Sequence, residues 1–233
     1  MNVLFLDEHL VAVHKPAGLF IHRTALNRSE RTVLPQSVRD HLGRHVYPVH
    51  RLDRPTSGVV VFGLSSASAR AMAEQFVGRR VRKRYLAVVR GFVAEESVLD
   101  EALPPEPGLP LQEAVTEVLR RGTGELPVPV GSFPTARYSL VEARPRTGRP
   151  HQIRRHLAHA GHPVLGDVAH GDNRHNHLFR DHLGVTGLLL HALELSLAHP
   201  VTGEPLTFRA PLPPPWDVVL RAFGWEAPEG GPI

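Results

Sequence analysis

The 233-residue sequence contains no cysteine, which excludes disulfides and cysteine-ligated zinc sites. Long apolar runs are missing too, since no stretch approaches the ~20 residues that cross a membrane. The first apolar run ends at Asp7 and follows no basic segment, unlike a secretory signal. We therefore expect a cytoplasmic protein that does not associate with membranes.

Several catalytic motifs are also absent. The sequence has no glycine-rich phosphate loop of either nucleotide-binding type, and no single stretch pairs two carboxylates for hydrolysis. Residues 63–67 resemble a nucleophile elbow but lack its final glycine. The sequence does not point to nucleotide-dependent, serine-dependent or paired-carboxylate chemistry.

Lysine is scarce: Lys15 and Lys83 are the only lysines among 27 basic residues, and the formal net charge is +4. Arginine binds phosphate through two parallel hydrogen bonds and stacks on bases, so an arginine-rich basic protein suits nucleic acid. The alternative is the codon bias of a GC-rich genome. Two basic groups, 79–84 and 144–155, form either one basic surface or two separate solvated faces.

Sixteen histidines raise the possibility of a metal site. His151, His156 and His159 fall in one expected helix. A zinc-binding helix pairs histidines four residues apart, with a Glu directly after the first. Here the spacings are five and three, and Gln152 follows His151. We expect histidines that are hydrogen-bonded or at the surface, and no metal.

Periodicity and turn residues predict an α+β fold, with a mixed, mostly antiparallel β-sheet and flanking helices. One domain is expected over residues 1–226, or two tightly joined halves, with a flexible tail at 227–233. Strands are expected at 3–6, 10–14, 58–63, 81–91, 114–119, 135–142, 187–198 and 205–209. Helices are expected at 34–42, 66–77, 150–161 and 215–223. Loops are expected at 22–31, 104–111, 122–134 and 172–182.

Two of these elements make finer predictions. In the strand at 81–91, Lys83 and Tyr85 share one face, opposite Arg82 and Arg84. In the helix at 150–161, Ile153, Leu157 and Ala160 form the core stripe. Arg154 borders that stripe, and a partly buried arginine requires a carboxylate partner.

The stretch from His50 to Gly58 places one carboxylate, Asp53, among Arg51, Arg54 and a histidine, directly before an apolar strand. A structural turn with a surface ion pair would explain it, because exposed ion pairs are common and weak. A rigidly held catalytic carboxylate would explain it equally well. The residues of this stretch alone do not separate the two.

The chain resembles the pseudouridine synthases of the RluA type from Val3 to about Leu212. The motifs that carry the resemblance are Lys15-Pro16-Ala17-Gly18, His50-Arg51-Leu52-Asp53 with Thr56-Ser57-Gly58, Lys83-Arg84-Tyr85 with Gly91, Thr147-Gly148-Arg149 with His151-Gln152-Ile153-Arg154, His162-Pro163 with Gly166-Asp167, and Leu190-His191-Ala192.

The resemblance implies the pseudouridine synthase catalytic fold, with Asp53 as the essential catalytic aspartate. It implies that Tyr85 packs on the target base, that Arg154 pairs with Asp53, and that Arg51 helps to extrude the nucleotide. Lys83 and Ile153 fall in its substrate-binding motifs. It implies no cofactor and no metal. Many relatives carry an N-terminal S4-type RNA-binding module, which we expect to be absent because the catalytic pattern begins at residue 3.

Two departures from the common pattern concern histidines. His14 stands where many relatives have Asn, and His170 where Tyr is usual. Together with His22-Arg23, Arg28 and residues 173–176, they resemble the TruC branch, which modifies uridine 65 of tRNA. We therefore expect a monomeric enzyme that acts on tRNA without a protein partner. The alternatives are an rRNA substrate, a non-catalytic RNA-binding protein, or a metallohydrolase.

The implied reaction breaks the N1–C1′ bond of uridine, turns the base, and rejoins it through C5. Asp53 must be ionised, either as a nucleophile or as a base at the sugar. Burial raises the pKa of a carboxyl group, whereas a close arginine lowers it. A buried Asp53 therefore needs Arg154 or Arg51.

Overall fold

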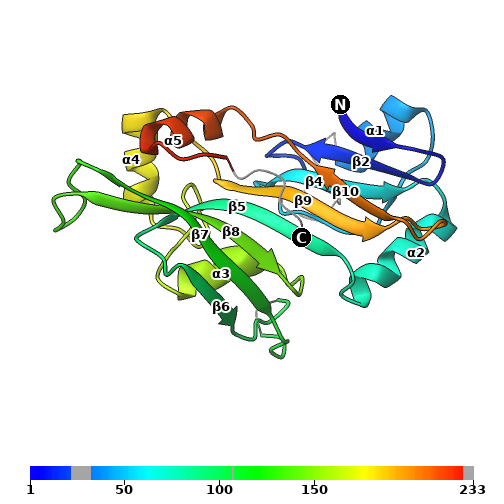
Figure 1. Ribbon diagram of the computed structural model, residues 1–233, viewed down its shortest axis with the longest axis horizontal. Coiled ribbons are helices and arrows are strands. Elements are labelled where there is room, and N and C mark those ends of the chain that lie inside the picture. The colour runs from blue at the N-terminus through cyan, green and yellow to red at the C-terminus, as the bar shows by residue number, and fades with distance from the viewer. Residues whose placement is uncertain (22–32, 107, 228–233) are drawn as a thin grey trace. The chain divides into compact units, whose positions relative to one another are not determined.

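The computed structural model describes residues 1–21, 33–106 and 108–227, and its elements are labelled in Figure 1. The chain divides into two compact units. The first comprises Met1–Lys83 and Ala192–Pro211, and the second comprises Arg84–His191 and the segment that begins at Leu212. Strands β5 (Arg82–Arg90) and β9 (Leu190–Ala198) each continue from one unit into the other.

The first unit is built on antiparallel strands. β2 pairs with β1 on one side and with β4 on the other, while β3 also pairs with β4 and β10 pairs with β9. The bounds are β1 (Asn2–Leu6), β2 (Leu10–Lys15), β3 (Tyr47–Pro48), β4 (Ser57–Gly63) and β10 (Pro205–Arg209). The hairpin expected at the start of the chain and the strand expected at 58–63 are confirmed.

Two helices complete the first unit, α1 (Leu34–Leu42) and α2 (Ser66–Val77). Gly43 ends α1 in the left-handed conformation. The Ser65 side chain accepts the Ser68 N–H at the start of α2, so one free helix N–H is satisfied. Met72 of α2 is fully buried in a cluster with residues of β2, β4, β9 and β10. Both helices match their predicted ranges.

The second unit contains an antiparallel sheet in the order β5–β8–β7–β6. Its further strands are β6 (Glu96–Asp100), β7 (Val115–Leu126) and β8 (Ala136–Pro145), and its helices are α3 (Gln152–His159), α4 (Asn173–Leu183) and α5 (Pro215–Phe223). The ladders in both units support the predicted α+β class with a mostly antiparallel sheet. None of the helices in the described ranges has the length and apolar character to cross a membrane.

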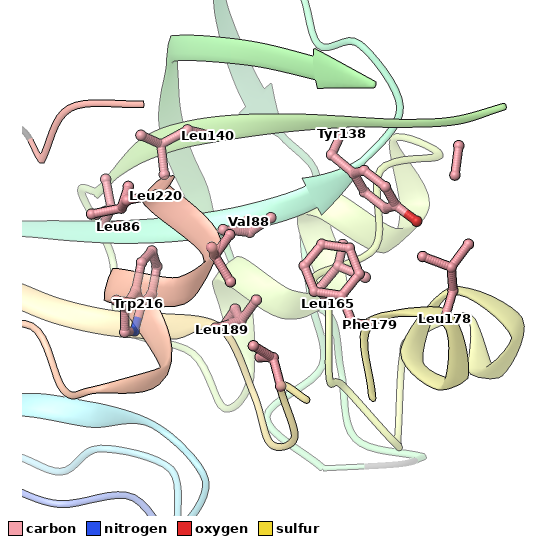
Figure 2. Packing of buried hydrophobic residues seen from close by; sticks show 13 residues of the cluster. Leu86, Val88, Tyr138, Leu140, Leu165, Leu178, Phe179, Leu189, Trp216 and Leu220 are labelled. Carbon is pink, nitrogen blue, oxygen red and sulfur yellow. The ribbon is translucent and has the colours of Figure 1, made fainter. Parts of the chain in front are cut away.

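Each face of this sheet carries its own core. Leu86, Val88 and Leu140 cluster with Trp216 and Leu220 of α5, as Figure 2 shows. The alternating neighbours Ala87, Val89 and Val141 cluster on the other face, with Ile153 and Leu157 of α3. The period-two alternation of the strands therefore decides which helix each face binds.

Two of the predicted loops are wrong. The polar run at 172–182 is mostly helix α4, which Asp172 caps by accepting the Arg174 N–H. His175, Leu178 and Phe179 recur at helical spacing within it and are buried. The loop expected from residue 122 begins later, because β7 continues to Leu126.

The glycines that suggested that loop have a packing reason. A Cβ at Gly122 would overlap the ring of Trp225, and one at Gly124 would overlap the ring of Phe223. The strand therefore uses glycine where aromatic side chains lie against its backbone.

Smaller differences concern β6 and α3. β6 was not predicted; its alternately exposed residues pair with β7. Helix α3 begins at Gln152 rather than at residue 150, and it ends at His159. Ala160, expected in the core stripe, lies beyond the helix and is exposed. The loop expected at 22–31 and most of the expected tail lie outside the described residues.

Candidate active site

The Asp53 segment is a tight turn held by a buried lysine. The Thr56 N–H donates to the Asp53 carbonyl at 3.1 Å, which closes the turn. Lys15 is fully buried, and its Nζ donates to the carbonyl oxygens of Pro16, Arg54 and Thr56 at 3.1, 3.0 and 2.7 Å. An ammonium group has three donors, so all of them are used to fix this turn.

Burial also changes the protonation equilibrium of Lys15. It lowers the pKa of Lys15 to about 8, against the opposing charge of Asp53. Asp53 itself is half-buried. The Lys15 ammonium therefore orders the loop through carbonyl oxygens, and the negative charge of Asp53 acts on it as well.

The corner at Lys15–Gly18 holds the other side of the turn. The Gly18 N–H donates to the Arg54 carbonyl at 2.8 Å, and Arg54 Nε donates to the Gly18 carbonyl at 3.0 Å. The Arg54 guanidinium also lies 4.7 Å from the centre of the Phe20 ring. Gly18 has φ 92°, a conformation that glycine adopts readily. Arg54 is exposed and contacts this corner.

His50 begins the motif and has a structural role. Its Nε2 accepts the Val61 N–H at 3.0 Å, and its ring stacks on Phe76 at 4.8 Å. Burial, with the positive charge of Lys83, lowers the pKa of His50 to about 3. The imidazole is therefore neutral and acts as an acceptor that ties the motif to β4.

Two predicted substrate residues also lie in the first unit. Arg51 is exposed. Lys83 lies at the start of β5, and burial lowers its pKa to about 8. Both lysines of the chain therefore hold their protons less tightly than a solvated lysine does.

Arg154 lies in the second unit, on α3, and is 4% exposed. It makes two hydrogen bonds to Asp167, from Nε to Oδ2 at 2.7 Å and from Nη2 to Oδ1 at 2.8 Å. Asp167 is therefore a carboxylate partner of the kind that the sequence predicts for Arg154. Asp53 belongs to the first unit, and its pairing with Arg154 stays a prediction.

Asp167 also organises the loop that follows it. Its Oδ1 accepts the N–H groups of Ala169 and His170 at 2.9 and 3.0 Å. Burial raises the pKa of Asp167, but the hydrogen bonds from Arg154 and from the backbone outweigh it, so the pKa is lowered. Asn176 supports the same loop from α4, because its side chain accepts the Gly166 N–H and donates to the Asp167 carbonyl. No local pattern in the sequence assigns this role to Asp167, although the expected burial of Arg154 indicated that such a carboxylate exists.

Tyr85 and Ile153 are placed by the sheet and by α3. Tyr85 lies opposite Ala143 on β8 and is partly buried against the cluster that contains Ile153. Ile153 is 6% exposed and immediately precedes Arg154. Its side chain packs the helix onto the sheet, and a contact between Ile153 and substrate stays a prediction.

The second basic group is engaged inside its unit. Glu142, fully buried, accepts hydrogen bonds from Arg84, Arg121 and Arg144, and these lower its pKa to about 2 against the effect of burial. The other arginines of the group have acceptors of their own: Arg146 donates to Glu117, Arg149 to the Glu113 carbonyl, and Arg155 to the Pro104 carbonyl. Much of this charge therefore binds groups within the protein. The sequence had suggested either one basic surface or two solvated faces, and neither included such internal contacts.

The three histidines considered for zinc have separate partners. His156 is buried between Thr116 and the Glu101 carbonyl, His159 lies against the Glu101 carboxylate, and His151 lies against His170. Among the described residues, no three metal-ligating side chains lie together. Hydrogen bonding, as expected, accounts for these histidines.

Comparisons with known proteins agree with one another. Residues 9–159 match the family model described as RNA pseudouridylate synthase. The chain is 48% identical to tRNA pseudouridine synthase C of Salmonella typhi, over 97% of the chain and 91% of that protein. For the protein of the same name from Vibrio cholerae, the identity is 45%, over 97% of both.

One relative is longer. The chain is 49% identical to tRNA pseudouridine synthase C of Pectobacterium carotovorum over 97% of the chain, but it spans 63% of that protein. Among solved structures, human RNA pseudouridylate synthase domain containing 4 matches with a TM-score of 0.74 and 26% identity, over 98% of this chain and 95% of that one.

Proposed function

The chain belongs to the RNA pseudouridylate synthase family, and we propose that it converts uridine 65 of tRNA to pseudouridine with Asp53 as the essential carboxylate. The observation that carries the choice of tRNA is the 45–49% identity, over 97% of the chain, to proteins named tRNA pseudouridine synthase C. An rRNA substrate is the alternative within the family.

The geometry of the Asp53 turn supports a chemical role for its side chain. Lys15 and the Gly18 corner hold the turn through backbone carbonyls and a backbone N–H. The turn that carries Asp53 is therefore held in part by hydrogen bonds between backbone groups and a buried lysine, and these bonds do not use the Asp53 carboxylate. A pre-organised reacting group lowers the barrier because no ordering is needed during the reaction.

In the proposed reaction the ionised Asp53 acts at the sugar or at the base while the N1–C1′ bond breaks. The base then turns, a C5–C1′ bond forms, and the proton on C5 is lost while N1 gains one. Arg154 pairs with the Asp53 carboxylate in this proposal, and Asp167 orients the guanidinium through its Nε and Nη2 atoms. A guanidinium beside the carboxylate would orient it through charge-assisted hydrogen bonds.

The target base must leave the helical stack before it reacts, which costs a few kcal/mol. Tyr85 restores stacking on the extruded base, a contact worth about 1–3 kcal/mol in comparable sites. Arg51, which is exposed, assists extrusion, while Lys83 and Ile153 belong to the substrate site. No cofactor or metal takes part in the proposed reaction.

The decisive experiment maps pseudouridine in unmodified tRNA and in rRNA fragments after incubation with the protein and no added metal. Asp53→Asn should abolish product while tRNA binding stays within about threefold, because the amide cannot act as nucleophile or base. Asp40→Asn is the matched control, an exposed aspartate on α1 that accepts only a surface hydrogen bond from Gln36 in the described contacts. It should retain full activity.

Each alternative has its own result. Product at wild-type level from Asp53→Asn would remove Asp53 from the chemistry. Product only in rRNA fragments would move the substrate within the family. Binding without any product would favour a non-catalytic RNA-binding protein, and activity that a chelator abolishes would favour a metal-dependent enzyme.

A further inference from the structure

Two histidines to which the proposed function gives no role lie against each other in the second unit. His151 Nδ1 is 2.9 Å from His170 Nε2, and the rings meet edge to face with their centres 5.2 Å apart. His151 is exposed and directly precedes α3, whereas His170 is half-buried at the end of the loop that Asp167 organises. The pair therefore joins the start of the Arg154 helix to that loop.

The backbone at His151 is strained. Its φ is 53°, and among the described residues only Arg79 is another non-glycine residue with positive φ. This left-handed conformation is unfavourable for a residue with a Cβ, and such strain gathers at functional sites. The chain carries a histidine where glycine would fit the backbone better.

The hydrogen bond between the rings orients His151. One nitrogen of the pair must donate and the other must accept, so the two rings cannot both be protonated at the shared contact. Burial and the positive charges of Arg154, His151 and Arg155 lower the pKa of His170, against the opposing charge of Asp167. A neutral His170 thus fixes the ring of the exposed His151, whose Nε2 lies on the side of the ring away from Nδ1.

The charges around the pair favour an anion. Arg155 follows on α3 and Arg149 precedes the helix, and each donates to a backbone carbonyl in the contacts described above, so those contacts do not cancel either charge. The nearest carboxylate in these contacts, Asp167, is fully buried and is neutralised by Arg154. The anion that an RNA substrate brings to such a surface is a backbone phosphate.

We propose that His151, oriented by His170, binds a backbone phosphate that flanks the target uridine. The proposal rests on the proposed function, because Arg154, three residues further along α3, is the proposed partner of the reacting carboxylate. Three residues of helix span about 5 Å, so the phosphate lies close to the extruded nucleotide. In this scheme His151 is a substrate-binding residue and His170 is a positioning residue.

The test uses unmodified tRNA and a set of tRNAs in which single phosphates around the target are replaced by neutral methylphosphonates. One flanking replacement should raise the KM and Kd of the wild-type protein about tenfold, in keeping with a hydrogen bond to a charged group. His151→Gly should weaken binding of ordinary tRNA by the same factor, and the methylphosphonate should then add nothing. Its kcat should stay within about twofold, and the slope of log Kd against log salt should fall by about 0.7–0.9.

The stability of His151→Gly and two further variants separate phosphate binding from a structural effect. His151→Gly removes the side chain where glycine suits the backbone, so its thermal midpoint should not fall by more than a few degrees. His170→Phe keeps a ring but loses the nitrogen, and should show a smaller loss of about two- to threefold in KM. His159→Ala, on the same helix and exposed against Glu101, is the matched control and should bind tRNA like the wild type.

The outcomes separate the two claims. If each methylphosphonate penalty persists in full in His151→Gly, His151 does not bind a phosphate. A fall in kcat and thermal midpoint with no change in the interference pattern would likewise overturn the proposal and assign the pair a purely structural role. If the wild type makes no pseudouridine in any RNA, the proposed function fails, while the Kd interference pattern still decides the phosphate contact.

Discussion

The two units hold their predicted catalytic residues with buried charges of opposite sign. In the first unit the cation of Lys15 is satisfied by carbonyl oxygens around Asp53. In the second unit the carboxylate of Asp167 is satisfied by the guanidinium of Arg154 and by N–H groups of its own loop. In both, a buried charge with a full set of hydrogen bonds orders a turn.

The two arrangements differ in electrostatic cost. Lys15 is held by neutral dipoles, and burial lowers its pKa to about 8. Asp167 is held by a formal opposite charge, and its pKa is lowered, so its charged form is favoured despite burial. Neutral acceptors therefore offset only part of the free-energy cost of burying a cation. A two-point ion pair with added N–H donors offsets more than the cost of burying an anion.

Each of the two turns is flanked by a glycine that lies against another part of the backbone. Gly58 ends the Asp53 motif with φ 124°, and a Cβ there would overlap the Ala192 carbonyl. Gly166 precedes Asp167 with φ 77°, and a Cβ there would overlap the Gly187 carbonyl. Both turns therefore lie against a neighbouring backbone, which fixes them at close range.

The largest expected effect is on the ion pair of the second unit. Asp167→Asn leaves the Arg154 charge buried beside a neutral amide. We expect the free energy of unfolding to fall by about 3–5 kcal/mol, as when one partner of a buried pair is removed. Pseudouridine formation should fall more than tenfold even at temperatures where the variant is folded. Urea unfolding and the tRNA assay measure the two effects.

Asp181→Asn is the control for that substitution, because Asp181 pairs with Arg180 at the surface with both side chains exposed. It should leave stability and activity unchanged. Equal stabilities for wild type and Asp167→Asn would mean that the second unit does not depend on its buried charge, and the comparison of the two units would fail.

The second expected effect is the pH dependence due to Lys15. Its pKa is about 8 in the folded protein and 10.5 for an ordinary solvated lysine, so between these values the unfolded chain binds more protons. Stability must then rise with pH in that range. From pH 8 to pH 10 the contribution of Lys15 is a gain of about 2 kcal/mol.

Lys15→Met should lack this gain when urea unfolding is measured at pH 8, 9 and 10. The other titrating groups are shared by the two proteins, so the difference between their pH profiles isolates Lys15. The variant should also lose at least tenfold in pseudouridine formation at pH 7, because the three carbonyls that orient the Asp53 turn lose their donor. Parallel pH profiles would show that Lys15 is not desolvated in the folded protein.

The sequence predicted those elements whose signals are local. The range of α1 followed from Pro35 and Gly43, that of α2 from a serine cap, and the hairpin at the start of the chain from two short apolar runs. These signals act through backbone geometry at the residue itself. No distant contact was needed to read them.

The errors arose where a distant contact decides the structure. Gly122 and Gly124 indicated a loop, but they are strand residues against the rings of Trp225 and Phe223, about a hundred positions on. The many polar residues of α4 concealed its three buried positions. The residue types around Arg154 predicted that it needs a carboxylate partner. They did not identify Asp167, because this residue lies thirteen positions further along the chain and reaches α3 only through the fold.

The smallest expected effect is that of Arg54→Ala, which tests whether the exposed Arg54 holds the Asp53 turn as strongly as the buried Lys15 does. Arg54 donates to the Gly18 carbonyl and lies over Phe20, but it is exposed. An exposed contact of this kind contributes about 0.5–1 kcal/mol, so Arg54→Ala should cost no more than that in urea unfolding. Pseudouridine formation should stay within about threefold, because Lys15 still binds the carbonyls of residues 16, 54 and 56. If Arg54→Ala lost as much pseudouridine formation as Lys15→Met, the exposed Arg54 would hold the turn as much as the buried lysine does. Lys15 would then not play the part in the first unit that Asp167 plays in the second.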